Sequence, residues 1–216
     1  MEYEVRYYYP KSELENINNK LGSIRELKKE NRIYEKTEQY DHPSSDISFY
    51  SKEIDGRFRI RVSKGDKISK CKLSWKRRVP TTSLTDVNEE EEIELTIKYE
   101  EYENLLFIVN NVLRMKSVES YERYRTVYTN DEIEIAVDEY PFGIALEIEN
   151  KSITGNPKEI VRKWVENIGL HINNSYRLSW DDKYSELCKN QNIEKFKHVT
   201  FDKPMPEVKW MEEIWK

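Results

Sequence analysis

The sequence predicts an α+β fold, in which a mostly antiparallel sheet closes into a barrel and a few helices cover the outside. Most segments alternate polar and apolar residues with the period of two that strands require. Three segments instead repeat apolar residues at three- and four-residue steps, as amphipathic helices do. Charged residues make up 36% of the chain, well above the usual quarter, and on several strands they gather on one face by sign.

The composition excludes several classes of protein. With 36 Lys and Arg against 41 Asp and Glu, the net charge of −5 predicts no partner by itself. The only two cysteines, Cys71 and Cys188, are too few for a disulfide scaffold and lack zinc-ligand spacing. No apolar run is long enough to cross a bilayer, and Met1 leads directly into a strand pattern. We therefore expect a cytoplasmic protein with no membrane partner.

The first 115 residues indicate strands interrupted by two helices. A strand over 2–9 precedes a helix over 10–22, with Pro10, a capping box from Ser12 to Glu15 and a terminating Gly22. Strands follow over 32–41, 47–52, 57–66, 70–78 and 92–99, and SKGDK predicts a hairpin turn between two of them. We interpret 89–91 as a solvated loop before the last of these strands. The apolar spacing over 99–115 predicts a helix whose apolar stripe packs on the barrel.

The second half continues with strands over 120–129, 132–140 and 143–150. A third helix is predicted over 155–170, with Asn156 as N-cap, Pro157 in its first turn and Gly169 at its end. The remainder is less periodic, and we expect packing from its large apolar residues, namely Tyr176, Trp180, Tyr184, Leu187, Phe196 and Trp210.

Successive residues of a strand point to opposite faces, an alternation that we call strand parity. On the predicted strands this alternation sorts the charged residues by sign. The basic faces are formed by Arg57, Arg59 and Arg61, by Lys72 and Lys76 with Ser74, and by Arg123 with Arg125. The acidic faces are formed by Glu2 with Glu4, by Glu92 with Glu94, and by Glu147 with Glu149.

Each of these faces, taken alone, is typical of the wet outer side of an antiparallel strand. Sorting by sign favours another interpretation, because a merely soluble face is served as well by mixed charges. Two carboxylates of one strand lie about 7 Å apart, and several such pairs would repel unless a cation lay among them. Mg²⁺ or Mn²⁺ suits such oxygen ligands, and facing Arg and Lys suit a chain of phosphates. This arrangement requires a closed barrel with a polar interior.

The motifs together resemble the CYTH family, also called triphosphate tunnel metalloenzymes, which includes class IV adenylyl cyclases, thiamine triphosphatases and tripolyphosphatases. The resemblance lies in Glu2-x-Glu4-x-Arg6, Arg59-x-Arg61, Ser74-x-Lys76, Glu92 with Glu94, Arg123-x-Arg125, and the closing Asp138, Gly143, Glu147 and Glu149. The segment SWDDKYSELC, over 179–188, is similar to a further motif near the C-terminus of the family.

The resemblance implies an eight-stranded antiparallel barrel that forms a tunnel over residues 1–190, with 191–216 as an extension packing on or plugging it. It implies that Glu2, Glu4, Glu147 and Glu149 are catalytic and hold one or two Mg²⁺ or Mn²⁺ ions, supported by Glu92, Glu94 and Asp138. The substrate phosphates would be bound by Arg6, Arg57, Arg59, Arg61, Lys76, Arg123 and Arg125.

The resemblance predicts a metal-dependent triphosphatase acting on tripolyphosphate or on a nucleoside or thiamine triphosphate. Two alternatives stay open: a class IV adenylyl cyclase, which makes cyclic AMP and pyrophosphate from ATP, and a non-catalytic binder of nucleotide or polyphosphate. We expect a small-molecule partner rather than nucleic acid, because no basic patch is interleaved with aromatic residues. A homodimer is left open, since many relatives pair through the barrel exterior.

Overall fold

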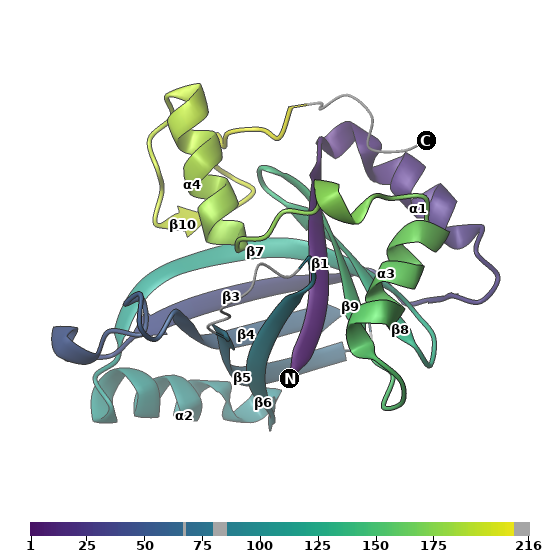
Figure 1. The fold of residues 1–216 in the computed structure, drawn as a ribbon. Helices are drawn as coiled ribbons and strands as arrows, with labels where there is room; N and C mark the ends of the chain where they lie inside the picture. The colour runs from purple at the N-terminus through teal and green to yellow at the C-terminus, as the bar shows by residue number, and fades with distance from the viewer. Residues whose placement is uncertain (67, 80–85, 210–216) are drawn as a thin grey trace.

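The computed structural model describes residues 1–66, 68–79 and 86–209, and it confirms the closed eight-stranded antiparallel barrel (Figure 1). The barrel strands are β1 (Glu2–Tyr9), β3 (Ile33–Asp41), β4 (Gly56–Gly65), β5 (Ile68–Arg78), β6 (Asn88–Lys98), β7 (Lys116–Thr129), β8 (Ile133–Tyr140) and β9 (Gly143–Asn150). Their order is β7-β3-β4-β5-β6-β1-β9-β8, and β8 pairs with β7 to close the ring. The two-residue strands β2 (Lys28–Lys29) and β10 (His198–Val199) also pair with β7.

Four helices accompany the barrel: α1 (Leu14–Gly22), α2 (Tyr102–Phe107), α3 (Pro157–Asn167) and α4 (Trp180–Gln191). A π-helical turn over Ile108–Val112 continues α2, and short 3-10 helices span Lys11–Glu13, Ser45–Ile47, Tyr99–Glu101 and Ile172–Asn174. In Figure 1, α2 lies below the sheet, α1 and α3 lie beside β1, β8 and β9, and α4 lies above β7. Within the described residues, no helix combines the length and apolar character needed to cross a membrane.

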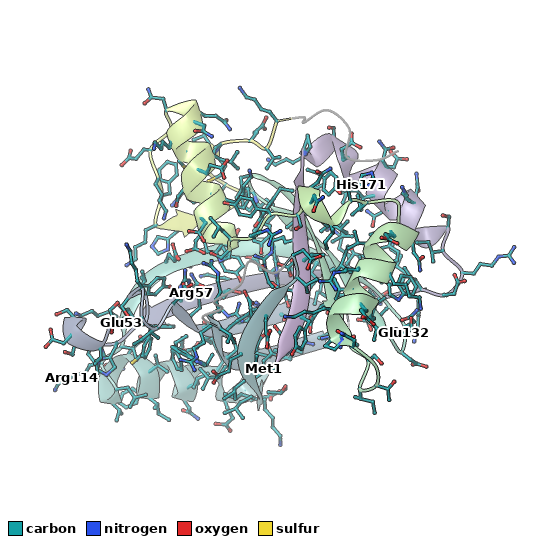
Figure 2. All side chains as sticks on the ribbon, in the orientation of Figure 1. Met1, Glu53, Arg57, Arg114, Glu132 and His171 are labelled. Carbon is teal, nitrogen blue, oxygen red and sulfur yellow. The ribbon has the colours of Figure 1, made fainter. Side chains whose placement is uncertain are left out.

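The hydrophobic core lies between the barrel and these helices, not inside the barrel. Val5 and Ile148, from the outward faces of β1 and β9, pack with Ile17 of α1 and Trp164 of α3. A second cluster lies under α4 and a third under α2. Side chains project from both faces of the strands, while Glu53 and Arg114 lie at the periphery (Figure 2). The strands thus place apolar residues outward and charged residues inward, as their parity predicts.

The ends of α3 confirm the sequence interpretation. Asn156 accepts a hydrogen bond from the backbone N–H of Lys158 at 3.0 Å, and Pro157 occupies the first turn. Gly169 follows the helix with φ of +76°, a left-handed conformation that glycine adopts without strain.

Helix α4 was missed by the sequence analysis, although its signals are present. Ser179 and Asp182 form a reciprocal capping box at its start, and Asn192 ends it in the left-handed conformation. Its buried residues Trp180, Tyr184 and Leu187 recur at four- and three-residue steps. Beyond α4, Val199 pairs with β7 and Val208 packs in the same cluster as α4, on the outside of the barrel.

Two predicted local structures are wrong near Asp41 and Ser12. Residues 47–52 form turns instead of a strand, because the Asp41 carboxylate accepts hydrogen bonds from the backbone of His42 and Phe49 and from the Ser48 hydroxyl. These bonds curl the segment back on the end of β3. The predicted capping box is also wrong: Ser12 lies within a 3-10 helix after Pro10, and α1 begins after Glu13 without a side-chain cap.

The predictions for 89–91 and 99–115 also need correction. Residues 89–91 belong to β6, because β1 pairs with its first residues and extends the strand. The helix over 99–115 is a succession of 3-10, α and π turns. Its apolar stripe packs only in part, since Val109 is buried whereas Val112 and Leu113 are 63% and 50% exposed. The expected packing of Trp210 falls outside the described residues.

Glu119 of β7 is a buried carboxyl on the wall between barrel and α4, and it makes stability depend on pH. Its side chain accepts a hydrogen bond from Gln39 at 2.6 Å. Burial, then the charge of Asp181, raise the pKa of Glu119 to about 7 from its ordinary 4.5, while Lys195 and Arg57 oppose the shift. The folded state therefore retains a proton between pH 5 and 7 that the unfolded state has lost.

Because the pKa is raised in the folded state, the free energy of unfolding falls as pH rises from about 5 to 8. We expect Glu119→Gln to remove this loss and to stabilise the protein at pH 8 by on the order of 2 kcal/mol. Urea denaturation at pH 5, 6, 7 and 8 measures the free energy of unfolding of both proteins. The exposed Glu103→Gln serves as control and should keep the wild-type profile. An unchanged profile for the Glu119 variant would contradict the assignment.

Candidate functional site

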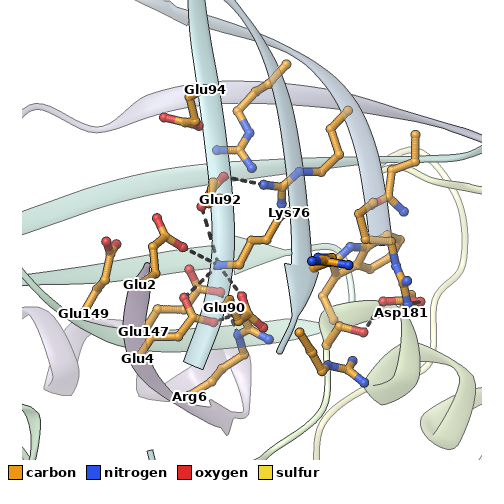
Figure 3. A pocket seen from close by; sticks show the side chains of 18 of the residues that line it. Glu2, Glu4, Arg6, Lys76, Glu90, Glu92, Glu94, Glu147, Glu149 and Asp181 are labelled. Carbon is orange, nitrogen blue, oxygen red and sulfur yellow. Dashed lines mark hydrogen bonds and ion pairs between the residues drawn. The ribbon is translucent and has the colours of Figure 1, made fainter. Parts of the chain in front are cut away.

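The barrel encloses a polar cavity of about 190 Å³ (Figure 3). Its lining includes eleven Lys and Arg residues and ten Asp and Glu residues. All the predicted site residues except Asp138 line it, namely Glu2, Glu4, Arg6, Arg57, Arg59, Arg61, Lys76, Glu92, Glu94, Arg123, Arg125, Glu147 and Glu149. Strands distant in sequence therefore bring the acidic and basic faces into one space.

Strand register places opposite charges beside each other across the cavity wall. Arg6 of β1 lies opposite Glu147 of β9, and Lys76 of β5 lies opposite Glu92 of β6. Directly opposed residues on one face of a sheet are close enough for their side chains to interact. At other positions the register pairs like charges, such as Arg61 with Lys72 and Glu2 with Glu90, so only some cations lie directly opposite a carboxylate.

An acidic cluster, formed by Glu2, Glu4 and Glu90, lies at one side of the cavity. Oxygen atoms of the three carboxylates lie within 4.8 Å of one another, so they can hold a metal ion. The Lys76 Nζ lies among them, 2.8 Å from Glu2, 3.0 Å from Glu4 and 2.6 Å from Glu90, and 3.7 Å from Glu92 (Figure 3).

Glu90 is the member of this cluster that sequence reasoning missed. It is 6% exposed and lies directly opposite Glu2 in the pairing of β1 with β6. Strand parity could have found it, because Glu90 shares the inward face with Glu92 and Glu94. Assigning 89–91 to a loop removed that signal.

The acidic cluster fits a hard divalent cation by its chemistry. Its donors are all carboxylate oxygens, which Mg²⁺ and Mn²⁺ prefer. Burial raises the pKa of Glu2 to about 9, in spite of Lys76, while its hydrogen-bonding neighbour Glu92 has a pKa lowered to about 2. The Lys76 ammonium, which contacts all three carboxylates, relieves part of the repulsion in the cluster.

The remaining predicted acidic residues occupy different surroundings. Glu147 accepts from Arg6 at 2.7 Å and from Arg125 at 2.8 Å, and these cations outweigh burial and hold its pKa well below the usual range. Glu149 pairs with Lys151 at 2.6 Å and lies opposite Glu4 in the β1–β9 register. Glu94 lies farther along β6 and pairs with Lys72 at 2.5 Å.

Asp138 lies behind the cavity wall and is fully buried. Its carboxylate accepts hydrogen bonds from Arg123 at 2.7 Å and from both Nε and Nη2 of Arg125 at 2.6 Å. Asp138 therefore orients the two guanidinium groups that face the cavity, and the structure does not bring it into the acidic cluster.

Arg61 is the lining guanidinium best placed to accept an anion. Its hydrogen bonds go to neutral groups, the Thr37 hydroxyl at 3.2 Å and the Tyr121 hydroxyl at 3.4 Å, and its ion pair with the Glu35 carboxylate is long, at 3.8 Å from Nε. Arg59, in contrast, donates to the Glu92 carboxylate at 2.7 Å. Although burial raises the pKa of Tyr121, Arg61 and Arg123 lower it to about 8.

The start of α4 closes one end of the cavity. Ser179, Trp180 and Asp181 line it, and Asp181 pairs with Arg57 at 3.2 Å. The adjacent Asp182 pairs with Arg78 at 2.8 Å. The sequence analysis did not place these residues in the site, because it found no helix there.

Comparisons with known proteins identify the fold. No protein-family model and no curated protein matches the chain. The PH1012 protein from Pyrococcus horikoshii matches with TM-score 0.62 and 20% identity over 84% of this chain and 98% of that one. HpAC1 from Hippeastrum, a candidate adenylyl cyclase with a dominant triphosphatase activity, matches with TM-score 0.55 and 19% identity over 90% and 98%.

A candidate adenylate cyclase from Vibrio parahaemolyticus matches with TM-score 0.59 and 16% identity over 85% of this chain and 98% of that one. These similarities, together with the closed antiparallel ring, confirm the predicted architecture. The chain shares the fold of these proteins, and this fold is a closed eight-stranded antiparallel barrel with a charged interior.

Asp138→Asn tests the role of Asp138 behind the wall. We expect a loss of about 3 kcal/mol in the free energy of unfolding, because the change leaves the buried Arg123 and Arg125 without their shared carboxylate. Urea denaturation measures it. The matched control is Glu139→Gln, the next residue of β8, whose partner Arg32 is 49% exposed. That control should cost less than about 1 kcal/mol, and equal losses for both variants would refute the role given to Asp138.

Proposed function

We propose that this protein is a divalent-metal-dependent hydrolase of a triphosphate, with Mg²⁺ or Mn²⁺ as its cofactor. One observation carries the proposal: a single buried cavity contains a carboxylate cluster suited to a hard cation beside guanidinium groups suited to phosphate. The names of two structural neighbours support a nucleotide or triphosphate substrate, since one is a candidate cyclase and another has triphosphatase activity.

In the proposed reaction, the acidic and the basic residues of the cavity have different roles. Glu2, Glu4 and Glu90, with Glu149 beside them, would hold a divalent cation, which would supply charge neutralisation and polarise a water molecule. Arg61 and Arg59 bind the phosphate oxygens and stabilise the negative charge that develops on the transferred phosphoryl group.

Arg123 and Arg125 extend this basic wall. Asp138 holds both guanidinium groups in place before the substrate arrives. Such preorganisation avoids a reorganisation cost during the reaction.

The size of the cavity favours a small, highly charged substrate. Its volume of about 190 Å³ is below the ~300–1,000 Å³ typical of pockets that enclose drug-sized ligands. The cavity is open at its rim, where the lining side chains of Arg77 and Lys151 are 41% and 39% exposed, so an attached nucleoside or thiamine could extend outward. Inorganic tripolyphosphate and nucleoside and thiamine triphosphates therefore all stay candidate substrates.

Product analysis distinguishes the proposed hydrolase from its rivals. The purified protein is incubated with tripolyphosphate, ATP or thiamine triphosphate, with Mg²⁺ or Mn²⁺ and with EDTA as control. Metal-dependent release of orthophosphate is the expected result. Formation of cyclic AMP and pyrophosphate from ATP would identify a cyclase instead, and tight triphosphate binding without turnover would identify a binding protein.

Glu90→Gln tests the residue that completes the acidic cluster. Removing one carboxylate should weaken Mn²⁺ binding and lower kcat by roughly a hundredfold. Calorimetric Mn²⁺ titration and orthophosphate release measure the two effects. Glu91→Gln is the matched control, because the neighbouring side chain points to the other face of β6 and pairs with Arg77. Wild-type rates in the Glu90 variant would exclude Glu90 from the metal site.

Arg61→Gln tests phosphate binding by the least neutralised guanidinium. We expect the KM for the triphosphate to rise roughly tenfold to a hundredfold, the value of a charged hydrogen bond, with a smaller change in kcat. Steady-state kinetics with saturating metal measure this. The exposed Lys64→Gln, on the same strand, is the control for loss of one positive charge. A KM that rises equally in both variants would point to general electrostatics instead.

A further inference from the structure

We propose that the Lys76 ammonium is a built-in substitute for the divalent cation: it fills the acidic cluster when no metal is bound, and metal binding displaces it into the cavity. The released ammonium then becomes a phosphate ligand. This inference rests on the proposed function, because it assigns an order of events to the same site.

The position of Lys76 is incompatible with a phosphate-binding role in the metal-free state. An ammonium group has three N–H donors. Nζ donates to the carboxylates of Glu2 at 2.8 Å and Glu4 at 3.0 Å, and it forms an ion pair with the Glu90 carboxylate at 2.6 Å. The side chain is 14% exposed, so little solvent competes for it. Lys76 must therefore leave these carboxylates before it can bind a phosphate.

The same carboxylates form the described group that can hold a metal. Mg²⁺ binds oxygen ligands at about 2.0–2.1 Å, which places it among the oxygens that Lys76 now contacts. Two cations cannot share this position, because both contact the same oxygens and repel each other. Metal and ammonium therefore compete for the acidic cluster.

Competition at the cluster produces cooperation between metal and triphosphate. Metal alone leaves the buried ammonium with only the more distant Glu92 carboxylate, 3.7 Å from Nζ, and triphosphate alone would draw Lys76 away and leave the carboxylates uncompensated. When both bind, the carboxylates receive the metal and Lys76 receives a phosphate. Each ligand therefore strengthens the binding of the other by linkage.

Lys72 provides an internal control for this argument. It lies four residues before Lys76 on β5, projects from the same face and lines the same cavity. It pairs with a single carboxylate, Glu94, and its side chain is 25% exposed. Removing Lys72 deletes the same charge without vacating the acidic cluster.

Titration of Mn²⁺ into the protein without phosphate tests the competition directly. Lys76→Met should bind Mn²⁺ on the order of tenfold more tightly than wild type, because no ammonium has to be displaced. Lys72→Met should bind like wild type. Unchanged or weaker Mn²⁺ binding by Lys76→Met would overturn the inference, and so would an equal gain in both variants.

A measurement on the wild-type chain covers the case in which Lys76→Met does not fold. Reductive methylation followed by peptide mass spectrometry reports the reactivity of each lysine amine. Mg²⁺ should increase labelling of Lys76 and leave labelling of Lys72 unchanged, because only Lys76 is released from buried carboxylates. Unchanged or decreased labelling of Lys76 with saturating Mg²⁺ would refute displacement.

Both measurements are made without substrate, so their results can be distinguished from a test of the proposed function. Metal-dependent release of Lys76 without triphosphate turnover would support the inference and contradict the hydrolase. Turnover together with a Lys76 that metal does not affect would support the hydrolase and contradict the inference.

Discussion

Charge compensation inside the barrel is the constraint on which the rest of the structure depends. A buried carboxylate or guanidinium costs several kcal/mol unless an opposite charge and hydrogen bonds accompany it. The cavity meets this requirement through paired groups, such as Glu147 between Arg6 and Arg125, and Lys76 among three carboxylates. Breaking one of these contacts leaves a buried charged group without its partner. The groups therefore respond to a ligand as a connected network.

The polar interior also determines where the core lies. Since the inward faces carry charge, the barrel buries apolar surface only by covering its outward faces with helices. α1 and α3 cover β1, β8 and β9, α2 covers the β4–β5 side, and α4 covers the strands near Tyr121 and Tyr140. α4 also supplies Asp181 to Arg57. The helix that completes the core therefore also closes the cavity, and stability and ligand access are linked through it.

Strand parity allowed much of the site to be predicted, because a period of two assigns each charged residue to a face without knowledge of its neighbours. Strand parity could not predict which residues of neighbouring strands lie opposite each other. Nothing in the sequence indicates that Asp138 would bind Arg123 and Arg125 behind the wall, or that Lys76 would lie opposite Glu92. Glu90 was missed for a related reason, since residues 88–91 join β6 through long-range pairing with β1 and β5. Pairing between strands distant in sequence thus determines the ends of strands and the contacts of side chains, which the local pattern of residues does not show.

Near-equal numbers of cationic and anionic side chains line the cavity, eleven against ten. A triphosphate without metal would add negative charge and displace cations from their carboxylates. A metal without triphosphate would add positive charge and leave the arginines as they are. Together the charges of the two ligands cancel in part, and each ligand finds groups of opposite charge that the other has released. Under the proposed function, this balance would favour the metal–phosphate complex over either component, and it would account for the presence of both residue types in one cavity.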